Sequence, residues 1–115
     1  MAPMENRPLA TELDARFGTR IPYNQEVLIN KQTFGMIKDI SETGCFLETK
    51  KIFGLGQDIS LKFFLVAPIQ ASVETKARVV NIRPGAGVGV KFSFESEKPA
   101  KIIKQFIEGL LSKKS

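Results

Sequence analysis

Hydrophobic and polar residues alternate along much of this chain, in the pattern of strands that bury one face. The clearest case is residues 59–65, where one face would carry only apolar side chains: Ile59, Leu61, Phe63 and Leu65. Successive side chains of a strand point to opposite faces, so this segment predicts a half-buried strand. Similar patterns predict five further strands, at residues 25–29, 34–40, 44–49, 69–82 and 88–94.

Short connections separate the predicted strands, at residues 30–33, 54–56 and 84–87 among others. These connections contain Gly, Pro and Asn, which favour turns. Strands joined by short connections, with no helix between them, pair antiparallel and close into a small barrel or a sandwich. We therefore predict a mainly β domain of six strands.

The end of the chain follows a helical period instead. Ser96 and Pro99 provide a start signal for a helix over about residues 98–112. Apolar residues then form one stripe: Ile102, Ile103, Phe106, Ile107, Leu110 and Leu111. The stripe predicts an amphipathic helix. We expect it to pack on the barrel, and a helix that binds a partner or a membrane surface is the alternative.

Residues 1–14 show neither a strand pattern nor a strong helix pattern. Two prolines and few apolar residues predict a flexible N-terminal arm there. Residues 15–115 would then form one domain, with a barrel over about residues 22–95. A chain of 115 residues is long enough for a single hydrophobic core.

The composition argues against several classes of function. The chain has no His, so it lacks the usual general base at neutral pH and imidazole ligands for a metal. Its one Cys, Cys45, cannot form an intrachain disulfide, and we expect a buried structural thiol there. Nothing resembles a nucleophile–base pair or a phosphate-binding loop. We therefore expect neither an enzyme nor a cofactor, while the net charge of +5 favours an anionic partner.

The sequence predicts a cytoplasmic protein. The first twenty residues contain no apolar run of the kind found in a signal peptide. The longest apolar stretch, Phe63–Ile69, is too short to span a bilayer. A single Cys also fits a reducing compartment.

Two short motifs carry candidate chemistry: Arg-Phe-Gly-Thr-Arg at residues 16–20, and Asp-Ile-Ser-Glu-Thr-Gly at residues 39–44. Guanidinium groups bind phosphates bidentately, bind the O6/N7 positions of guanine and stack on bases. The carboxylate of Asp39 complements the ring N–H and amino group of guanine, a pair of donors that adenine lacks. Ser41 adds a hydroxyl, and Gly44 would permit a positive φ and the close approach of a ligand.

Each motif alone also fits a structural role. Arg16 and Arg20 fit a solvated basic arm, and residues 41–44 fit an ordinary hairpin turn with Asp39 as its cap. Their order along the chain is more informative. The arginine pair precedes the first strand, the second motif follows the second strand, and Gly-Val-Gly-Val-Lys-Phe at residues 87–92 precedes the helix.

This combination resembles the PilZ family, whose members are receptor domains for the bacterial second messenger cyclic di-GMP. The resemblance covers roughly Arg16 to Leu111 and implies a six-stranded antiparallel β-barrel with a C-terminal amphipathic helix. It also implies a set of ligand-binding residues: Arg16, Arg20, Asp39, Ser41, Gly44 and Gly89.

The resemblance assigns a role to each of these residues. The two arginines would grip phosphates and guanine, Asp39 would accept hydrogen bonds from a guanine, and Ser41 would bond the ligand nearby. Gly44 would shape the turn, and Gly89 would leave room for the ligand on the barrel surface. The arm would fold over the ligand when it binds. Ala15, before the first arginine, leaves open whether one ligand or a stacked pair binds.

The resemblance further implies an unidentified effector protein, which a monomer or weak dimer of this chain would contact in trans. The process it would control, such as motility or biofilm formation, is left open. One alternative is a PilZ-like scaffold that binds no nucleotide, as in type IV pilus assembly, but such domains typically lack the arginine pair. The other is a small nucleic-acid-binding barrel. Most Phe residues alternate inward and form no stacking stripe, so we expect no nucleic-acid polymer as partner.

Overall fold

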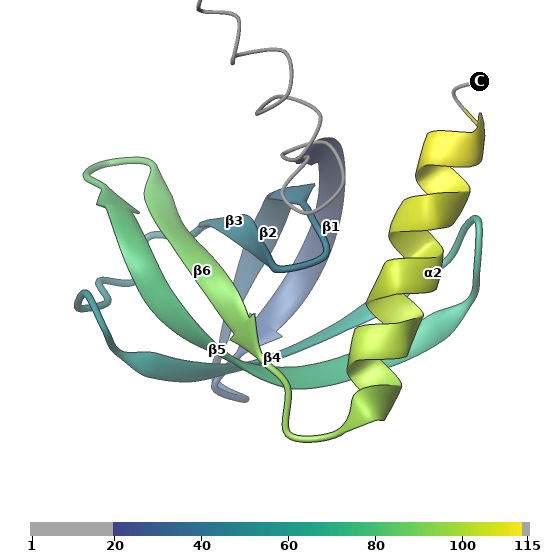
Figure 1. The fold of residues 1–115 in the computed structure, drawn as a ribbon. Coiled ribbons are helices and arrows are strands. Elements are labelled where there is room, and N and C mark those ends of the chain that lie inside the picture. The colour runs from purple at the N-terminus through teal and green to yellow at the C-terminus, as the bar shows by residue number, and fades with distance from the viewer. Residues whose placement is uncertain (1–19, 114–115) are drawn as a thin grey trace, which may run out of the picture.

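The computed structural model of the chain describes residues 20–113, and it consists of a β-barrel followed by one helix (Figure 1). The strands are β1 (Ile21–Ile29), β2 (Thr33–Ile40), β3 (Gly44–Glu48), β4 (Asp58–Leu65), β5 (Ala71–Arg83) and β6 (Gly87–Ser93), and the helix is α2 (Glu97–Lys113). The strands pair antiparallel in the closed order β1-β2-β3-β6-β5-β4. The predicted six-stranded barrel with a C-terminal helix is confirmed, and the sandwich is not what forms. The predicted arm and Arg16 lie outside the described residues.

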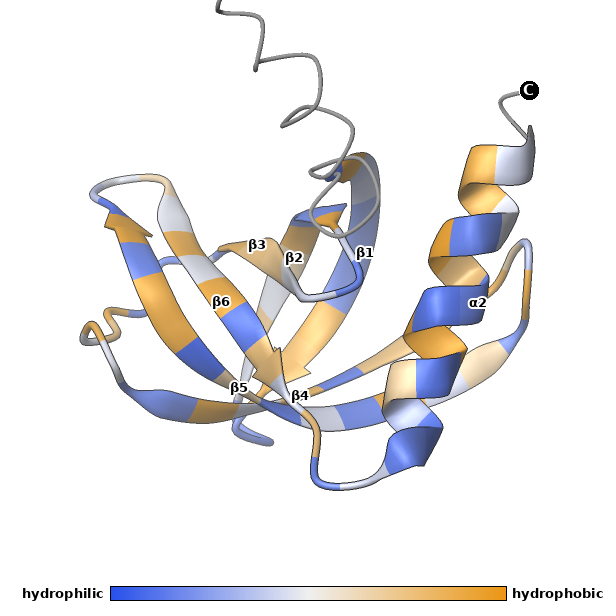
Figure 2. Cartoon of the chain, viewed as in Figure 1, coloured by the Kyte–Doolittle hydropathy of each residue, from blue (hydrophilic) through white to orange (hydrophobic). Residues whose placement is uncertain are grey.

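The alternating pattern that predicted the strands is the pattern of burial in the barrel. The four apolar residues of β4 that were expected on one face are at most 2% exposed, as are Val73, Ala77 and Val79 of β5. Hydrophobic and hydrophilic positions alternate visibly along β5 (Figure 2). Burying a Val, Leu, Ile or Phe side chain is worth about 1.5–3 kcal/mol, so these positions contribute to the stability of the barrel.

Three irregularities in the strand pairing modify this simple alternation. The register shifts between Pro22 and Gln25 in β1, between Ile37 and Asp39 in β2, and between Val79 and Asn81 in β5. A bulge of this kind changes which face the following side chains occupy. In β2 the shift leaves Ile37 and Ile40 buried in the core and places Asp39 at half-exposure between them.

The ring of strands closes at a short seam between β1 and β4. This pair has two residue pairs in register, Leu28 with Lys62 and Ile29 with Leu61, whereas β4 pairs with β5 over the whole length of β4. Asn30 reinforces the seam in two ways. Its backbone N–H donates to the carbonyl of Ser60 at 2.9 Å, and its side-chain carbonyl accepts from the Ser60 N–H at 2.9 Å.

Helix α2 packs on the barrel, as its apolar stripe predicts. Ile103, Phe106 and Ile107 are at most 3% exposed. The ring of Phe106 meets the ring of Tyr23 in β1, with centroids 5.0 Å apart in an edge-to-face arrangement. Gly109 lies against Pro68 of the β4–β5 connection, so α2 is held from two sides. Across residues 20–113, no helix has the length and apolarity needed to cross a membrane.

Candidate functional site

The turn between β2 and β3 is built around the hydroxyl of Ser41. Its Oγ accepts hydrogen bonds from the backbone N–H groups of Thr43 and Gly44, both at 3.2 Å, and lies 3.2 Å from the carbonyl of Gly44. The side chain is 1% exposed. The hydroxyl therefore has its partners within the turn, where it satisfies backbone groups that a tight turn would otherwise leave unpaired.

Gly44 is required for a different reason from the one its position in a turn suggests. A glycine there would permit a positive φ, but Gly44 does not adopt one. A Cβ at this position would lie 2.1 Å from the carbonyl oxygen of Val90. Glycine is needed because β3 and β6 approach closely here. Gly44 is itself buried, so it supports the turn from the side of the barrel core.

The structure brings one of the predicted arginines to this turn. Nη1 of Arg20 donates a hydrogen bond to Oδ1 of Asp39 at 2.8 Å. Arg20 immediately precedes β1, and Asp39 lies opposite Pro22 in the pairing of β1 with β2. The two side chains are 46% and 30% exposed, so a ligand in solution can reach both.

Strand pairing extends a row of outward positions from Asp39 across the barrel. Asp39 pairs with Phe46, Phe46 pairs with Gly89, and Gly89 pairs with Asn81. We call these four residues the outer row. Residues directly opposite in neighbouring strands lie on the same face. Gly89 is buried and has no side chain, and a Cβ there would lie 3.4 Å from Cβ of Asn81.

Arg83 is a candidate site residue that the motifs do not reveal. Its guanidinium carbon lies 4.9 Å from the centroid of the Phe46 ring, within the range of a cation–π interaction. Phe46 and Arg83 are far apart in sequence and meet because β3 and β5 both pair with β6. The sequence does contain one indication of Phe46. It lies two residues after the glycine of the second motif, and because side chains alternate along a strand, it faces outward where Cys45 faces the core.

Further basic residues lie next to the outer row, on β5 and β6. Lys91 pairs with Gly44 on one side and with Arg78 on the other. Arg78 is bound to Asp58 at 2.9 Å, and this hydrogen bond lowers the pKa of the Asp58 carboxyl and raises the pKa of Arg78. The charge of Arg78 is thus largely offset, and Lys91 and Arg83 remain as exposed positive groups beside the row.

Burial explains the chemistry of Cys45. The thiol is fully buried in the core beneath the turn, as predicted, and desolvation raises its pKa. It is therefore an apolar filler and not a nucleophile. Among residues 20–113 there is also no cluster of three or more His, Cys, Asp or Glu side chains that could bind a metal ion.

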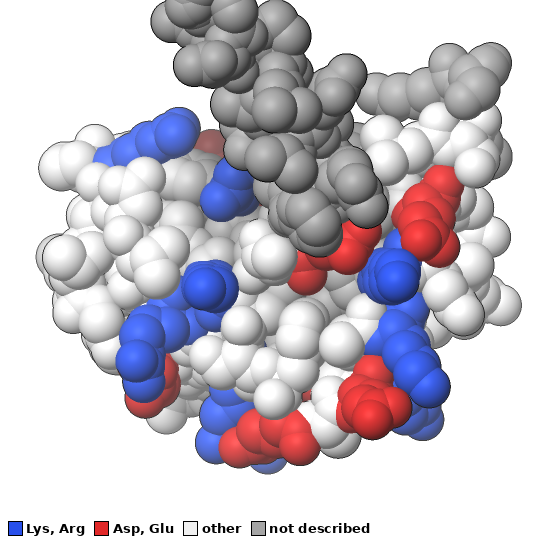
Figure 3. Space-filling view, viewed as in Figure 1, with Lys and Arg blue, Asp and Glu red and all other residues white. Residues whose placement is uncertain are grey.

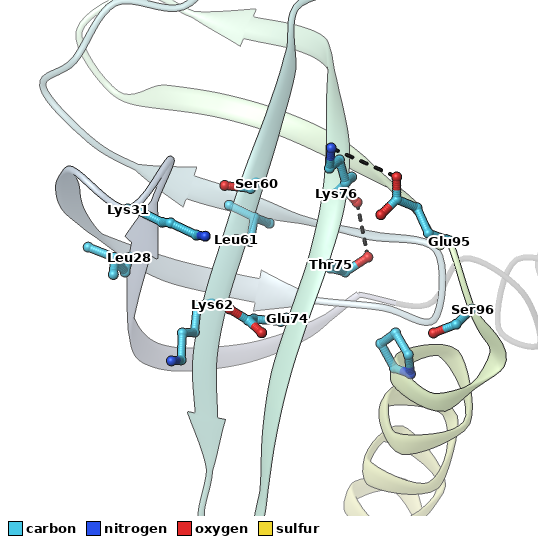
Figure 4. A pocket seen from close by; sticks show the side chains of 11 residues that line it. Leu28, Lys31, Ser60, Leu61, Lys62, Glu74, Thr75, Lys76, Glu95 and Ser96 are labelled. Atoms are coloured by element: carbon cyan, nitrogen blue, oxygen red, sulfur yellow. Dashed lines mark hydrogen bonds and ion pairs between the residues drawn. The ribbon is translucent and has the colours of Figure 1, made fainter.

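A separate pocket of about 280 Å³ lies between β4, β5 and the start of α2 (Figure 4). Its charged lining is mixed: Lys31, Lys62, Lys76, Glu74 and Glu95. Lys76 and Glu95 form an ion pair at 3.8 Å, shown as a dashed line. This pocket contains none of the residues of the two sequence motifs, so it is separate from the face that carries Arg20 and Asp39.

Comparison with known proteins assigns the chain to a family. The model of the PilZ domain matches residues 14–109, so the chain belongs to the PilZ domain family. Among solved structures it is similar to the inhibitor of motility MotI/DgrA of Bacillus subtilis, with a TM-score of 0.64 and 17% identity. The match covers 84% of this chain and 51% of the other, so the chain spans about half the length of that structure. No curated protein matches the chain.

Proposed function

We propose that this protein is a cytoplasmic receptor for cyclic di-GMP, and that it acts without catalysis, by binding an effector protein in trans. The observation that carries the proposal is the contact between Arg20 and Asp39 beside the Ser41 turn. It brings a guanidinium and a carboxylate together at one end of the outer row. Membership of the PilZ family supports the same ligand.

The chemistry of the ligand matches the two exposed groups. Cyclic di-GMP carries two phosphates and two guanines. Arg20, with Arg16 as its expected companion, would bind phosphate oxygens and the O6/N7 positions of guanine. Asp39 would accept hydrogen bonds from the ring N–H and amino group of guanine, which gives selectivity against adenine. In the free protein Arg20 and Asp39 satisfy each other, so the ligand exchanges one charge-assisted contact for several.

The remaining predicted residues would act on the shape of the site. Ser41 and Gly44 would position Asp39 by fixing the turn, because the Ser41 hydroxyl is buried and Gly44 lies against β6. Gly89 would leave space above the row for the ligand, with the Phe46 ring beside it. A base lying there would meet an aromatic ring and the guanidinium of Arg83, both of which stack on nucleobases.

Signal output would follow from the segment that carries Arg16. Binding would hold this segment against the turn and create a new surface from arm, ligand and barrel. Such a change is driven by contacts that exist in the bound state alone. The structural neighbour is an inhibitor of motility, so control of motility is the output that we propose to test first.

Calorimetric titration of the purified chain with cyclic di-GMP tests the proposal, with cyclic di-AMP and GMP as competitors for specificity. We expect saturable binding selective for cyclic di-GMP, and the stoichiometry distinguishes one ligand from a stacked pair. Ligand at about 100 times its dissociation constant should add about 2.7 kcal/mol to the free energy of unfolding. No heat and no rise in melting temperature would favour the alternative, a PilZ-like scaffold that binds protein alone.

A further inference from the structure

One end of the barrel exposes apolar side chains that no other part of the described chain covers. It is formed by the β3–β4 connection and the β5–β6 turn, which lie on the side of the barrel away from α2 (Figure 1). Ile52 is 91% exposed, Phe34 64% and Ile82 39%. With the neighbouring basic residues they form what we call the barrel-end patch: Phe34, Lys50, Lys51, Ile52, Ile82 and Arg83.

The patch contains two adjoining hollows. The first, of about 470 Å³, has a largely apolar lining that includes Ile52, Ile82 and the buried Phe53. The second, of about 530 Å³, lies beside Phe34. Both are lined by Lys50 and Lys51, which therefore form a basic ridge between them. A surface with hollows of this size can receive side chains, which a flat surface cannot.

The charge of the patch is positive. Lys50, Lys51 and Arg83 are exposed, and none of them forms an ion pair within residues 20–113. No Asp or Glu lines the first hollow, although Glu26 and Glu48 line the second. Figure 3 shows Lys and Arg atoms bordering an uncharged area on the side away from α2. Like charges would oppose the pairing of this patch with its own copy in a symmetric dimer.

We propose that the barrel-end patch binds an acidic segment of a partner protein. Carboxylates of the segment would pair with Lys50, Lys51 and Arg83, and one of its aliphatic or aromatic side chains would enter the hollow between Ile52 and Ile82. Exposed apolar groups surrounded by charges are typical of protein-binding sites. The inference rests on the proposed function for the role of the partner, and Arg83 belongs both to the patch and to the proposed nucleotide site, so the test is made without nucleotide.

Two other anionic partners fit the patch less well. A nucleic acid would need several flat aromatic surfaces for its bases, but Phe34 is the one exposed aromatic ring of the patch, and Phe53 is buried. A lipid surface would meet the projecting Ile52 and the lysines but would leave the hollows unfilled. An acidic peptide segment fills the hollows and neutralises the basic ridge together.

The test is a titration of the full-length, nitrogen-15-labelled chain, without nucleotide, with a short synthetic peptide of alternating Glu and Leu. We expect amide shifts confined to residues 49–53 and 82–88 that weaken as salt is added. A peptide with Lys in place of Glu, and one with Ser in place of Leu, should each bind roughly tenfold more weakly. Because nucleotide is absent, failure here leaves the proposal about cyclic di-GMP untouched.

Variants separate a true site from general attraction to a basic protein. The charge reversal Lys50→Glu/Lys51→Glu should abolish the shifts, and Lys98→Glu/Lys104→Glu on α2, with the same change in net charge, should retain them. Ile52→Ser should weaken binding without loss of stability, because the side chain is 91% exposed. The proposal is overturned if both reversals behave alike, if the shifts map elsewhere, or if oligothymidine or phosphatidylglycerol vesicles bind the patch more tightly than the peptide.

Discussion

The guanidinium of Arg20 and the carboxylate of Asp39 lie 2.8 Å apart, and this contact ties the residue before β1 to the end of β2. Both side chains remain partly exposed, so solvent weakens the pair, and its net contribution to stability is about 1 kcal/mol or less. The contact therefore serves less to hold the fold than to place two groups of opposite charge at one end of the outer row.

The first prediction concerns these two residues. Arg20→Ala and Asp39→Asn should each lower the free energy of unfolding by no more than about 1 kcal/mol, because the pair is solvated. Each should weaken the binding of cyclic di-GMP at least tenfold, as measured by calorimetry, if one charge-assisted hydrogen bond to the ligand is lost. Lys101→Ala, which removes an exposed ion pair with Glu97 on α2, is the matched control. Equal affinity of all three variants would contradict the assignment.

The second prediction concerns the buried hydroxyl of the turn. Ser41→Ala leaves the N–H groups of Thr43 and Gly44 without their acceptor. We expect a loss of about 1–3 kcal/mol in the free energy of unfolding, measured by urea denaturation. Ser72→Ala, at an exposed position of β5, should change stability little. Should the two variants unfold at the same urea concentration, the turn would not depend on the Ser41 hydroxyl.

The third prediction compares two glycines. Gly44→Ala would place a methyl group against the Val90 carbonyl, where backbone must move, and should cost about 3 kcal/mol or more. Gly54→Ala meets one side-chain atom at 3.9 Å and should be nearly neutral. Circular dichroism and thermal melting would show the difference. A Gly44→Ala protein as stable as Gly54→Ala would mean that β3 and β6 can separate without cost.

The fourth prediction follows from the raised pKa of the Cys45 thiol. Burial disfavours the thiolate, which is the reactive form, so the native protein should react very slowly with a thiol reagent at pH 8. Reaction should accelerate in parallel with unfolding as urea is added. Rapid modification in the absence of denaturant would show that the turn above Cys45 opens locally.

The fifth prediction concerns pH. The bond from Arg78 lowers the pKa of Asp58 in the folded protein, so the stabilisation that it provides is present above the unfolded pKa of about 4 and is lost as the pH falls through the folded pKa. Wild type should therefore melt at a higher temperature than Asp58→Asn at neutral pH, and the difference should vanish in acid. Glu108→Gln on the exposed side of α2 is the control. A difference that persists unchanged at low pH would rule out the ion pair as its source.

The fold was predictable because its strands and helix each have one buried side. The apolar positions of β4 and the stripe of α2 follow local periodicities, and both are buried as those periodicities require. The register shifts at Ile37/Asp39 and Val79/Asn81 had no such signal. A bulge depends on how two strands pair, and the sequence of one strand does not determine that pairing.

The candidate site was predictable in part, for the same reason. The motifs identified Arg20 and Asp39, which the structure brings into contact. The positive φ that Gly44 would permit does not occur, and the close approach of Val90 was missed because Val90 lies in a strand that is distant in the sequence. The contact of Arg83 with Phe46 was missed since it arises from the order of strands around the barrel. The ligand-binding roles of all six predicted residues remain predictions.

The closed barrel is held most weakly at the short seam between β1 and β4. Along β2, β3, β6 and β5 each strand is held on both sides by longer ladders, whereas β1 and β4 meet at two residue pairs and the two bonds of Asn30. Thermal motion would therefore part the barrel there first and bare two strands with unpaired main-chain groups. Unpaired strand edges pair with the strand edges of other molecules. By holding β1 against β4, the side chain of Asn30 would therefore oppose aggregation.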